Sequence, residues 1–207
     1  FHDDEAVPAA LRWLGERRGG KPLALFVGTN WPHGPWPDPP QDFDPAQVKP
    51  PPTFVDTPAT REALARYFAA VSRMDSELGQ VFDAAMQRLG PNTLFLTTSD
   101  NGAQFPFGKW NLYDAGTRTP LIAVWPGVIR PGTRTDAMVS WVDILPTLVE
   151  LAGGSAPADL DGRSFAAVLL GKSSAHRELI FTTHSRDGDM NVYPCRAVRS
   201  AAWKYIR

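Results

Sequence analysis

Apolar and polar residues follow a helical period in three parts of the chain. The first is Asp4–Arg18, and the longest continues from the Thr57-Pro58 pair to Gly90-Pro91. Thr57 is a predicted N-cap with proline at the first helical position, and Gly90-Pro91 is typical of a helix end. A shorter helix is predicted over Asp143–Leu151.

Continuous apolar runs alternate with these helices and are typical of strands buried on both faces. They cover residues 22–28, 93–98 and 120–125. Strands that alternate with helices predict an α/β fold with a doubly wound, mostly parallel sheet. From residue 178 the pattern changes to short strand-like pieces with turns between them, which indicates antiparallel pairing. We therefore expect an α/β domain over residues 1–177 and the start of a small antiparallel subdomain over residues 178–207.

The segment from residue 35 to residue 58 is rich in proline, which excludes a helix or a central strand there. It is either a surface loop or a linker. Long loops inside a domain tend to be functional, and elements of one style continue on both sides of it. We favour a functional loop at the rim of a site.

Composition narrows the possible classes of protein. The chain has 207 residues, 43% of them hydrophobic and 21% charged, as expected for a folded globular protein. A net charge of -1 argues against a nucleic-acid partner, which needs a concentrated cationic face. No apolar run approaches the roughly 20 residues of a membrane span, so no membrane partner is expected. The single Cys195 excludes an internal disulfide.

Two predicted strands are followed directly by polar residues that are candidates for chemistry. Ligands bind at the carboxyl ends of parallel strands, where the segments Asn30–His33 and Ser99–Gly102 are expected. Asp100 and Asn101 offer hard oxygen ligands that suit calcium or magnesium. The alternative is a simple turn, because Asn-Gly is a common turn dipeptide.

Two further side chains could act on an anionic substrate. Lys109 lies in a loop with proline and glycine, where its ammonium could contact substrate oxygens as a point charge; the alternative is a solvated lysine. His33 has a backbone restrained by Pro32 and Gly34-Pro35. A histidine there can donate a hydrogen bond or protonate a leaving group, although a lone histidine can equally be structural.

Several segments of the chain recur, in the same order, in one known enzyme family. They are Val27–His33, Tyr67–Gly79, Thr98–Gly102, Gly108–Ile122, Val124–Gly127, Val142–Leu148 and Leu160–Ser164. This set resembles the sulfatase family of the alkaline-phosphatase-like superfamily. The resemblance implies an alkaline-phosphatase-like fold and a hydrolase of sulfate esters or sulfamates.

The resemblance also implies a role for each candidate residue. Asp100 and Asn101 match the ligands of a Ca²⁺ ion, and Lys109 matches a basic residue that contacts the sulfate. His33 matches a histidine that also faces the sulfate oxygens. The resemblance thus implies that these four residues, each of which also has a purely structural alternative, form a single anion site.

Within the family, the chain is most similar to the heparan N-sulfatase (sulfamidase) branch. The compact spacing from Asp100 to Lys109 and the segments Asp187–Met190 and Tyr193–Arg199 carry this likeness. The implied substrate is a sulfated sugar such as N-sulfoglucosamine, and the implied role is glycosaminoglycan degradation. The implied location is periplasmic, secreted or lysosomal. The sequence does not indicate an oligomeric state.

The chain departs from the family at the nucleophile. Sulfatases use a formylglycine made from Cys or Ser in a Cys/Ser-x-Pro-x-Arg motif, and Cys195 has Ala197 where the motif requires proline. We therefore expect a fragment whose formylglycine lies upstream of Phe1, and which alone is inactive. The alternatives are a phosphatase, phosphodiesterase or phosphonate hydrolase of the same superfamily, and a catalytically dead homologue that binds sulfated glycans.

Overall fold

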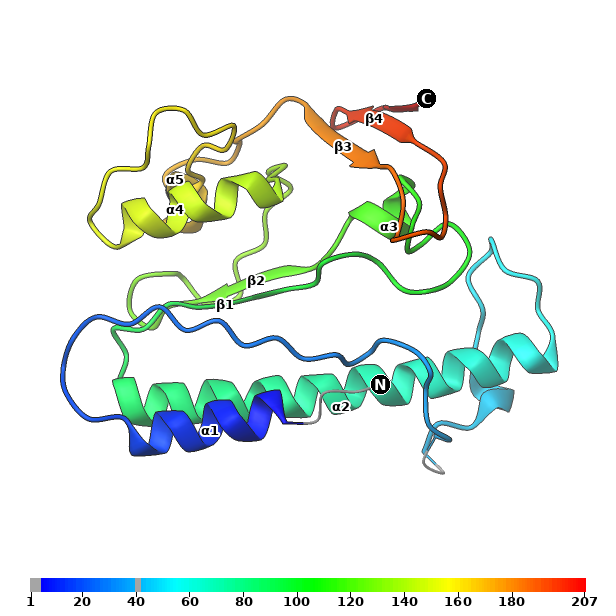
Figure 1. Cartoon of the computed structure of the whole chain (residues 1–207), viewed down its shortest axis with the longest axis horizontal. Coiled ribbons are helices and arrows are strands. Elements are labelled where there is room, and N and C mark those ends of the chain that lie inside the picture. The colour runs from blue at the N-terminus through cyan, green and yellow to red at the C-terminus, as the bar shows by residue number, and fades with distance from the viewer. Residues whose placement is uncertain (1–4, 40–41) are drawn as a thin grey trace. The chain divides into compact units, whose positions relative to one another are not determined.

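The computed structural model describes residues 5–39 and 42–207 (Figure 1). The chain divides into two compact units, each of which is described by itself. Unit 1 comprises Phe1–Thr93 and Ala103–Pro106, and unit 2 comprises Leu94–Gly102 and Phe107–Arg207. The boundary expected at residue 177 stays a prediction. Within the described ranges, none of the helices combines the length and the apolar character that a membrane crossing requires.

The elements of unit 1 are helical, whereas unit 2 contains both sheets. The helices are α1 (Ala6–Glu16), α2 (Pro58–Leu89), α3 (Asp114–Thr117), α4 (Ile144–Leu151) and α5 (Ala166–Leu169), with 3-10 turns η1 (Pro45–Gln47) and η2 (Trp141–Asp143). The strands are β1 (Phe95–Thr98), β2 (Leu121–Val124), β3 (Ile180–His184), β4 (Cys195–Arg199) and β5 (Lys204–Ile206).

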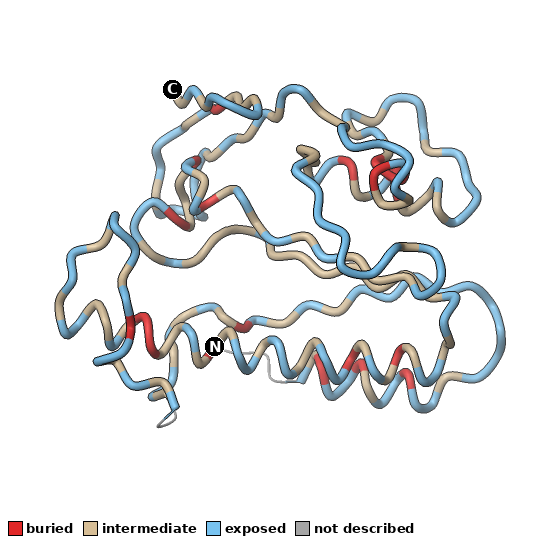
Figure 2. Tube along the Cα trace, turned by 180° about the vertical axis from the view of Figure 1, so that it is seen from behind, coloured by how far each residue is buried: buried red, intermediate tan, exposed pale blue. Residues whose placement is uncertain are grey.

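The long helix α2 begins and ends where the sequence predicts. Thr57 Oγ1 accepts a hydrogen bond from the backbone N–H of Thr60 at 3.1 Å. Gly90 ends the helix with φ of 81°, in the left-handed region that favours glycine. The helix α1 packs against α2, and Figure 2 shows buried positions recurring at intervals along both helices. The first residue of the predicted α1 segment, Asp4, lies outside the described residues.

The proline-rich segment packs on α2 within unit 1. Arg61 of α2 donates to the backbone oxygens of Ala46 at 3.0 Å and Val48 at 2.8 Å. A small core joins the two parts; its members are Val48, Leu64 and Ala65, with Phe43, Phe54 and Phe105 packed against them. The segment is therefore a packed loop and not a linker between domains.

The predicted doubly wound, mostly parallel sheet is wrong. Across residues 5–39 and 42–207 every strand pairing is antiparallel: β1 with β2, and β3 with β4 with β5. The apolar run 22–28 does not form a strand, and Leu23, Leu25 and Phe26 are exposed. An apolar run indicates a preference for burial, but it specifies neither the partner strand nor its direction. The antiparallel pairing predicted after residue 178 is confirmed.

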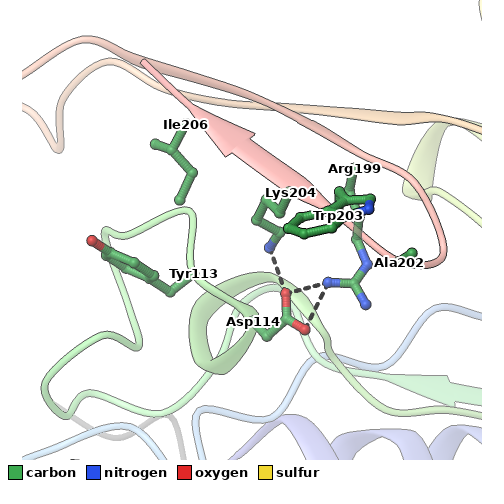
Figure 3. Close-up of a pocket in the computed structure, with 7 residues that line it drawn as sticks. All are labelled: Tyr113, Asp114, Arg199, Ala202, Trp203, Lys204 and Ile206. Atoms are coloured by element: carbon green, nitrogen blue, oxygen red, sulfur yellow. Dashed lines mark hydrogen bonds and ion pairs between the residues drawn. The ribbon is translucent and has the colours of Figure 1, made fainter.

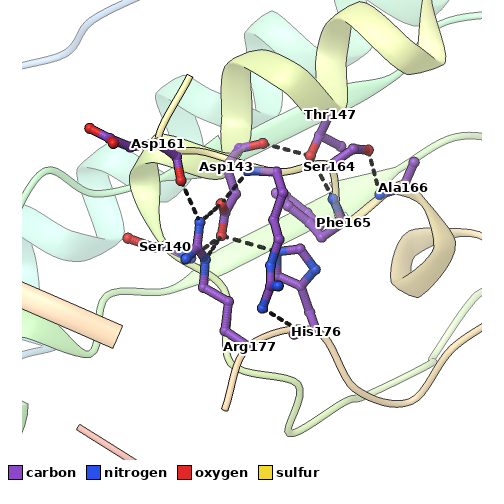
Figure 4. A network of polar contacts seen from close by, with 10 residues as sticks. Ser140, Asp143, Thr147, Asp161, Ser164, Phe165, Ala166, His176 and Arg177 are labelled. Carbon is purple, nitrogen blue, oxygen red and sulfur yellow. Dashed lines mark hydrogen bonds and ion pairs between the residues drawn. The ribbon is translucent and has the colours of Figure 1, made fainter. Parts of the chain in front are cut away.

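A buried carboxylate, Asp143, connects the segments around α4 (Figure 4). Asp143 is fully buried and accepts a hydrogen bond from Nε of Arg177 at 2.7 Å. It also accepts from the backbone N–H groups of Ser140 at 2.9 Å and Arg163 at 3.0 Å, and His176 Nε2 lies 3.1 Å away. Burial raises the pKa of Asp143, but the Arg177 guanidinium and the backbone donors outweigh it and lower the pKa to about 2.

Acid should remove the stabilisation that this carboxylate provides. The pKa of Asp143 falls from an ordinary 3.8 to about 2 on folding, so the stabilisation is complete above the ordinary value and is lost as the pH drops through the folded one. We expect a loss of about 2 kcal/mol in the free energy of unfolding between neutral pH and about pH 2. Urea unfolding across this range measures it.

The variant Asp143→Asn should lose this pH dependence and should be less stable at neutral pH by about 3 kcal/mol, because Arg177 keeps its charge without an anionic partner. The exposed Asp159 provides a matched control, and Asp159→Asn should behave as the wild type. A wild-type pH dependence in Asp143→Asn would contradict the assignment.

Candidate active site

Asp100 and Asn101 directly follow β1, in a turn closed by local hydrogen bonds. Ser99 Oγ donates to the backbone oxygen of Asn101 at 2.7 Å. The backbone N–H of Asn101 donates to Oδ1 of Asp100 at 2.9 Å. Asp100 is exposed and Asn101 is half-buried, so oxygen donors are accessible at the end of β1. We call residues 99–102 the Asp-Asn turn.

Gly102 lets the Asp-Asn turn approach α3 at backbone distance. Its N–H donates to the backbone oxygen of Gly116 at 2.9 Å. A Cβ added at Gly102 would lie 1.7 Å from the backbone oxygen of Ala115, which no side chain can tolerate. The position of the Asp-Asn turn therefore depends on glycine at residue 102.

Gly116 also receives the segment Gly108–Asn111, which carries Lys109 and which we call the Lys109 loop. A Cβ at Gly116 would lie 2.3 Å from the backbone oxygen of Gly108 and 2.4 Å from that of Asn111. The N–H of Asn111 donates to the oxygen of Gly108 at 3.1 Å and closes the loop. The Asp-Asn turn and the Lys109 loop thus both pack on Gly116.

The backbone of the Lys109 loop is held in an unusual conformation next to Lys109. Trp110 has φ of 68°, in the left-handed region that a bulky residue rarely adopts. Its indole Nε1 donates to Oδ2 of Asp187 at 2.9 Å, and its backbone oxygen accepts from the hydroxyl of Tyr193 at 3.0 Å. The Lys109 ammonium lies 5.3 Å from the centroid of the Trp110 ring. These contacts stabilise a conformation that costs about 1–3 kcal/mol.

His33 lies in unit 1, in a turn whose hydrogen bonds define its tautomer. Its backbone N–H donates to the oxygen of Asn30 at 2.7 Å. Its Nδ1 lies 2.5 Å from the backbone oxygen of Gly34, and a carbonyl oxygen can only accept, so Nδ1 carries a proton. Since Asp100, Asn101 and Lys109 belong to unit 2, a site shared with His33 stays a prediction.

Aromatic residues fix the turn of His33 within unit 1. Trp31 is buried, and the guanidinium of Arg73 lies 4.4 Å from the centroid of its ring. Trp36 donates from Nε1 to the backbone oxygen of Pro32 at 2.7 Å and stacks on Phe105 with ring centroids 5.0 Å apart. The residues on both sides of His33 are therefore anchored.

The donors at the Asp-Asn turn fit a hard cation in kind but not in number. Asp100 and Asn101 supply a carboxylate and an amide oxygen, which suit calcium. Calcium takes about six to eight oxygen ligands, so most of its ligands would have to come from elsewhere. Among the residues that the structure describes, no group of three or more His, Cys, Asp or Glu is placed to hold a metal.

Comparison with known proteins decides the family. The model of the Sulfatase family matches residues 1–155. This chain belongs to the sulfatase family. It is 31% identical over 197 residues to an ulvan-active sulfatase of Formosa agariphila, a match that covers 90% of the chain and 38% of that protein. It is 33% identical over 181 residues to N-sulphoglucosamine sulphohydrolase of Homo sapiens, covering 81% and 35%.

The fold is similar to that of a solved structure. BT4656, solved in complex with D-glucosamine-2-N,6-O-disulfate, matches with a TM-score of 0.64 and 23% identity over 74% of this chain and 34% of the other. The chain spans little more than a third of the length of the two curated sulfatases. The match to the family model confirms the resemblance to the sulfatase family that the sequence indicates. Sulfatases are typically calcium-dependent, in keeping with the hard oxygen donors of the Asp-Asn turn.

The sequence indicates Asp187 and Tyr193 by their likeness to the sulfamidase branch, but it does not indicate that they support the Lys109 loop. Asp187 and Tyr193 contact Trp110 across 77 and 83 residues of chain, so no local spacing indicates them. Gly102 and Gly116 carry a weak signal, because isolated glycines outside helix ends often mark close backbone contacts.

Replacing Gly102 should disturb the Asp-Asn turn. In Gly102→Ala the new Cβ would collide with the backbone oxygen of Ala115, and we expect a loss of about 1–3 kcal/mol in the free energy of unfolding. Gly79→Ala is the control, because no atom lies within 4 Å of that Cβ and alanine favours the helix α2. Urea unfolding compares the two. Equal stability of both variants would show that the close contact is absent.

Proposed function

We propose that the intact protein is a calcium-dependent sulfatase that hydrolyses the sulfate ester or sulfamate of a sulfated sugar. One observation carries the proposal: the Asp-Asn turn and the Lys109 loop pack on the same residue, Gly116. The turn contributes oxygen donors for a cation, and the loop contributes an ammonium. Membership of the sulfatase family supports the same reaction.

The residues of this chain have distinct tasks in the proposed reaction. A sulfate group spreads its negative charge over several oxygens, and the Lys109 ammonium would contact them as a point charge. Asp100 and Asn101 would hold the calcium ion, which supplies further positive charge when bound.

His33 would act through its second ring nitrogen. Nδ1 already donates to Gly34, so Nε2 would donate to a sulfate oxygen only after the ring takes up a second proton. In that imidazolium form His33 would add positive charge beside the sulfate, and it could give the proton to the leaving oxygen or nitrogen.

We propose that the nucleophile of the intact protein lies outside this chain. The sequence contains no Cys/Ser-x-Pro-x-Arg motif, and Cys195 does not supply one. Formylglycine would supply the group that attacks the sulfur. This chain would contribute the residues that bind the metal and the sulfate, and it would be inactive without that nucleophile.

We propose N-sulfoglucosamine as the substrate, and glycosaminoglycan degradation outside the cytoplasm as the setting. The similarity to N-sulphoglucosamine sulphohydrolase and the spacing from Asp100 to Lys109 support this choice. An O-sulfated sugar is the alternative substrate, and the chain is also similar to an ulvan-active sulfatase.

The experiment that tests the function is a comparison of substrates with the intact protein in the presence of calcium. We expect faster hydrolysis of N-sulfoglucosamine than of glucosamine 6-sulfate, and no hydrolysis of a phosphonate monoester. Preference for the phosphonate, together with two bound zinc ions, would contradict the proposal and favour a phosphonate hydrolase. Binding of the sulfated sugars without turnover would favour a catalytically dead homologue.

Lys109→Ala should slow the hydrolysis of every sulfated substrate, because the sulfate oxygens are common to all of them. Loss of one charge-stabilising donor typically lowers kcat by about 100- to 1,000-fold. Lys172→Ala is the matched control, since Lys172 is an exposed lysine of the same unit. A variant of Lys109 with altered sugar preference and an unchanged kcat on its preferred substrate would refute the assignment.

A further inference from the structure

The short helix α3, on which the Asp-Asn turn and the Lys109 loop pack, is held in turn by strands β4 and β5 of the C-terminal sheet (Figure 3). Nη1 of Arg199, on β4, donates to both carboxylate oxygens of Asp114, at 2.5 and 2.7 Å. Nζ of Lys204, on β5, lies 2.7 Å from Oδ1 of the same carboxylate. Lys204 also donates to the backbone oxygen of Leu112 at 2.8 Å and to Oγ1 of Thr117 at 2.9 Å. Lys204 therefore contacts the segment just before α3 and both the first and the last residue of this helix.

The charges at this contact favour a persistent interaction. The side chain of Lys204 is only 12% exposed, so its ammonium requires a close counter-charge. The hydrogen bond from Lys204 outweighs partial burial and, with that from Arg199, lowers the pKa of Asp114, which is therefore ionised at neutral pH. Hydrogen bonds between charged groups are stronger than those between neutral groups, and both donors to Asp114, Arg199 and Lys204, are cations.

The helix α3 depends on such support because it cannot hold its own conformation. It has four residues, fewer than a helix needs to be stable by itself, and its N-cap residue Tyr113 makes no capping hydrogen bond with its side chain. The contacts of Asp114 at its first position and of Thr117 at its last position instead attach both ends of α3 to β4 and β5. The place of Gly116 within α3 follows from these contacts.

We propose that Asp114 is a positioning residue of the active site. Held by Arg199 and Lys204, it fixes α3, and α3 fixes the Asp-Asn turn and the Lys109 loop through Gly116. The effect on the two loops follows from the contacts within unit 2. The effect on calcium and on turnover rests on the proposed function.

The test measures the loop and the metal separately in Asp114→Asn. Amide hydrogen exchange at Gly102 reports the hydrogen bond from its N–H to Gly116, and calcium titration of the intact protein reports the site. We expect exchange at Gly102 to become at least about 10-fold faster, and the calcium affinity to fall by about 10- to 100-fold, as for other groups that orient metal ligands. Asp114→Glu retains the carboxylate and should restore most of both properties.

Two controls separate positioning from other effects. Asp100→Ala removes a proposed ligand and should abolish calcium binding while leaving slow exchange at Gly102. Arg134→Ala removes an exposed cation of the same unit and should change neither property. Exchange at the buried N–H of Phe165, which donates to Thr147 at 2.9 Å, reports whether unit 2 remains folded. If Asp114→Asn unfolds, Arg199→Lys replaces it, because this variant keeps the charge but removes the guanidinium nitrogen that donates to both carboxylate oxygens.

The outcomes are distinct. Fast exchange at Gly102 with slow exchange at Phe165, and weaker calcium binding, supports the positioning role. Unchanged exchange and unchanged calcium affinity in both Asp114→Asn and Arg199→Lys overturns it. A wild-type protein that binds no calcium refutes the proposed function, and exchange at Gly102 then still decides whether Asp114 positions the loop.

Discussion

The contact between three backbone segments at Gly116 is the constraint on which the candidate site depends. The Asp-Asn turn reaches it through Gly102, and the Lys109 loop reaches it through the carbonyl oxygens of Gly108 and Asn111. A methyl group at residue 102 or 116 would lie between 1.7 and 2.4 Å from backbone oxygens of the neighbouring segments, so these segments would have to move apart. Close backbone packing, which the glycines at residues 102 and 116 allow, therefore helps to place two groups of different chemistry, the oxygen donors and the ammonium.

Unit 2 uses ion pairs in two different environments. Asp143 is fully buried and is satisfied by a guanidinium and two backbone N–H groups, which makes it a structural centre for the segments around α4. Asp114 is half-exposed, with 45% of its side chain accessible, and meets two cations from the C-terminal sheet. The buried pair gives stability within one region, whereas the half-exposed one connects the sheet to the loops of the candidate site.

Local signals were sufficient for some elements and not for others. The helix α2 was predictable because local residues determine both of its ends: Thr57 caps its start and Gly90 ends it. The strand pairing was not predictable, because apolar side chains such as Leu23 and Phe26 favour burial but do not specify a partner strand. Both side chains are exposed in the structure. Asp100, Asn101 and Lys109 were found from their place after a strand and from resemblance. The ion pair of Asp114 with Arg199 could not be predicted from the sequence, because the two residues are 85 positions apart in the chain.

The register of the C-terminal hairpin adds a reciprocal dependence. Arg199 and Lys204 are directly opposite each other in the pairing of β4 with β5. Like charges at opposite positions of an antiparallel pair repel and destabilise it. The carboxylate of Asp114 lies between them as a shared counter-ion, so the hairpin needs α3 as much as α3 needs the hairpin. The last strand of this chain and the loops of the candidate site therefore belong to one cooperative unit, in which neither part reaches its full stability without the other.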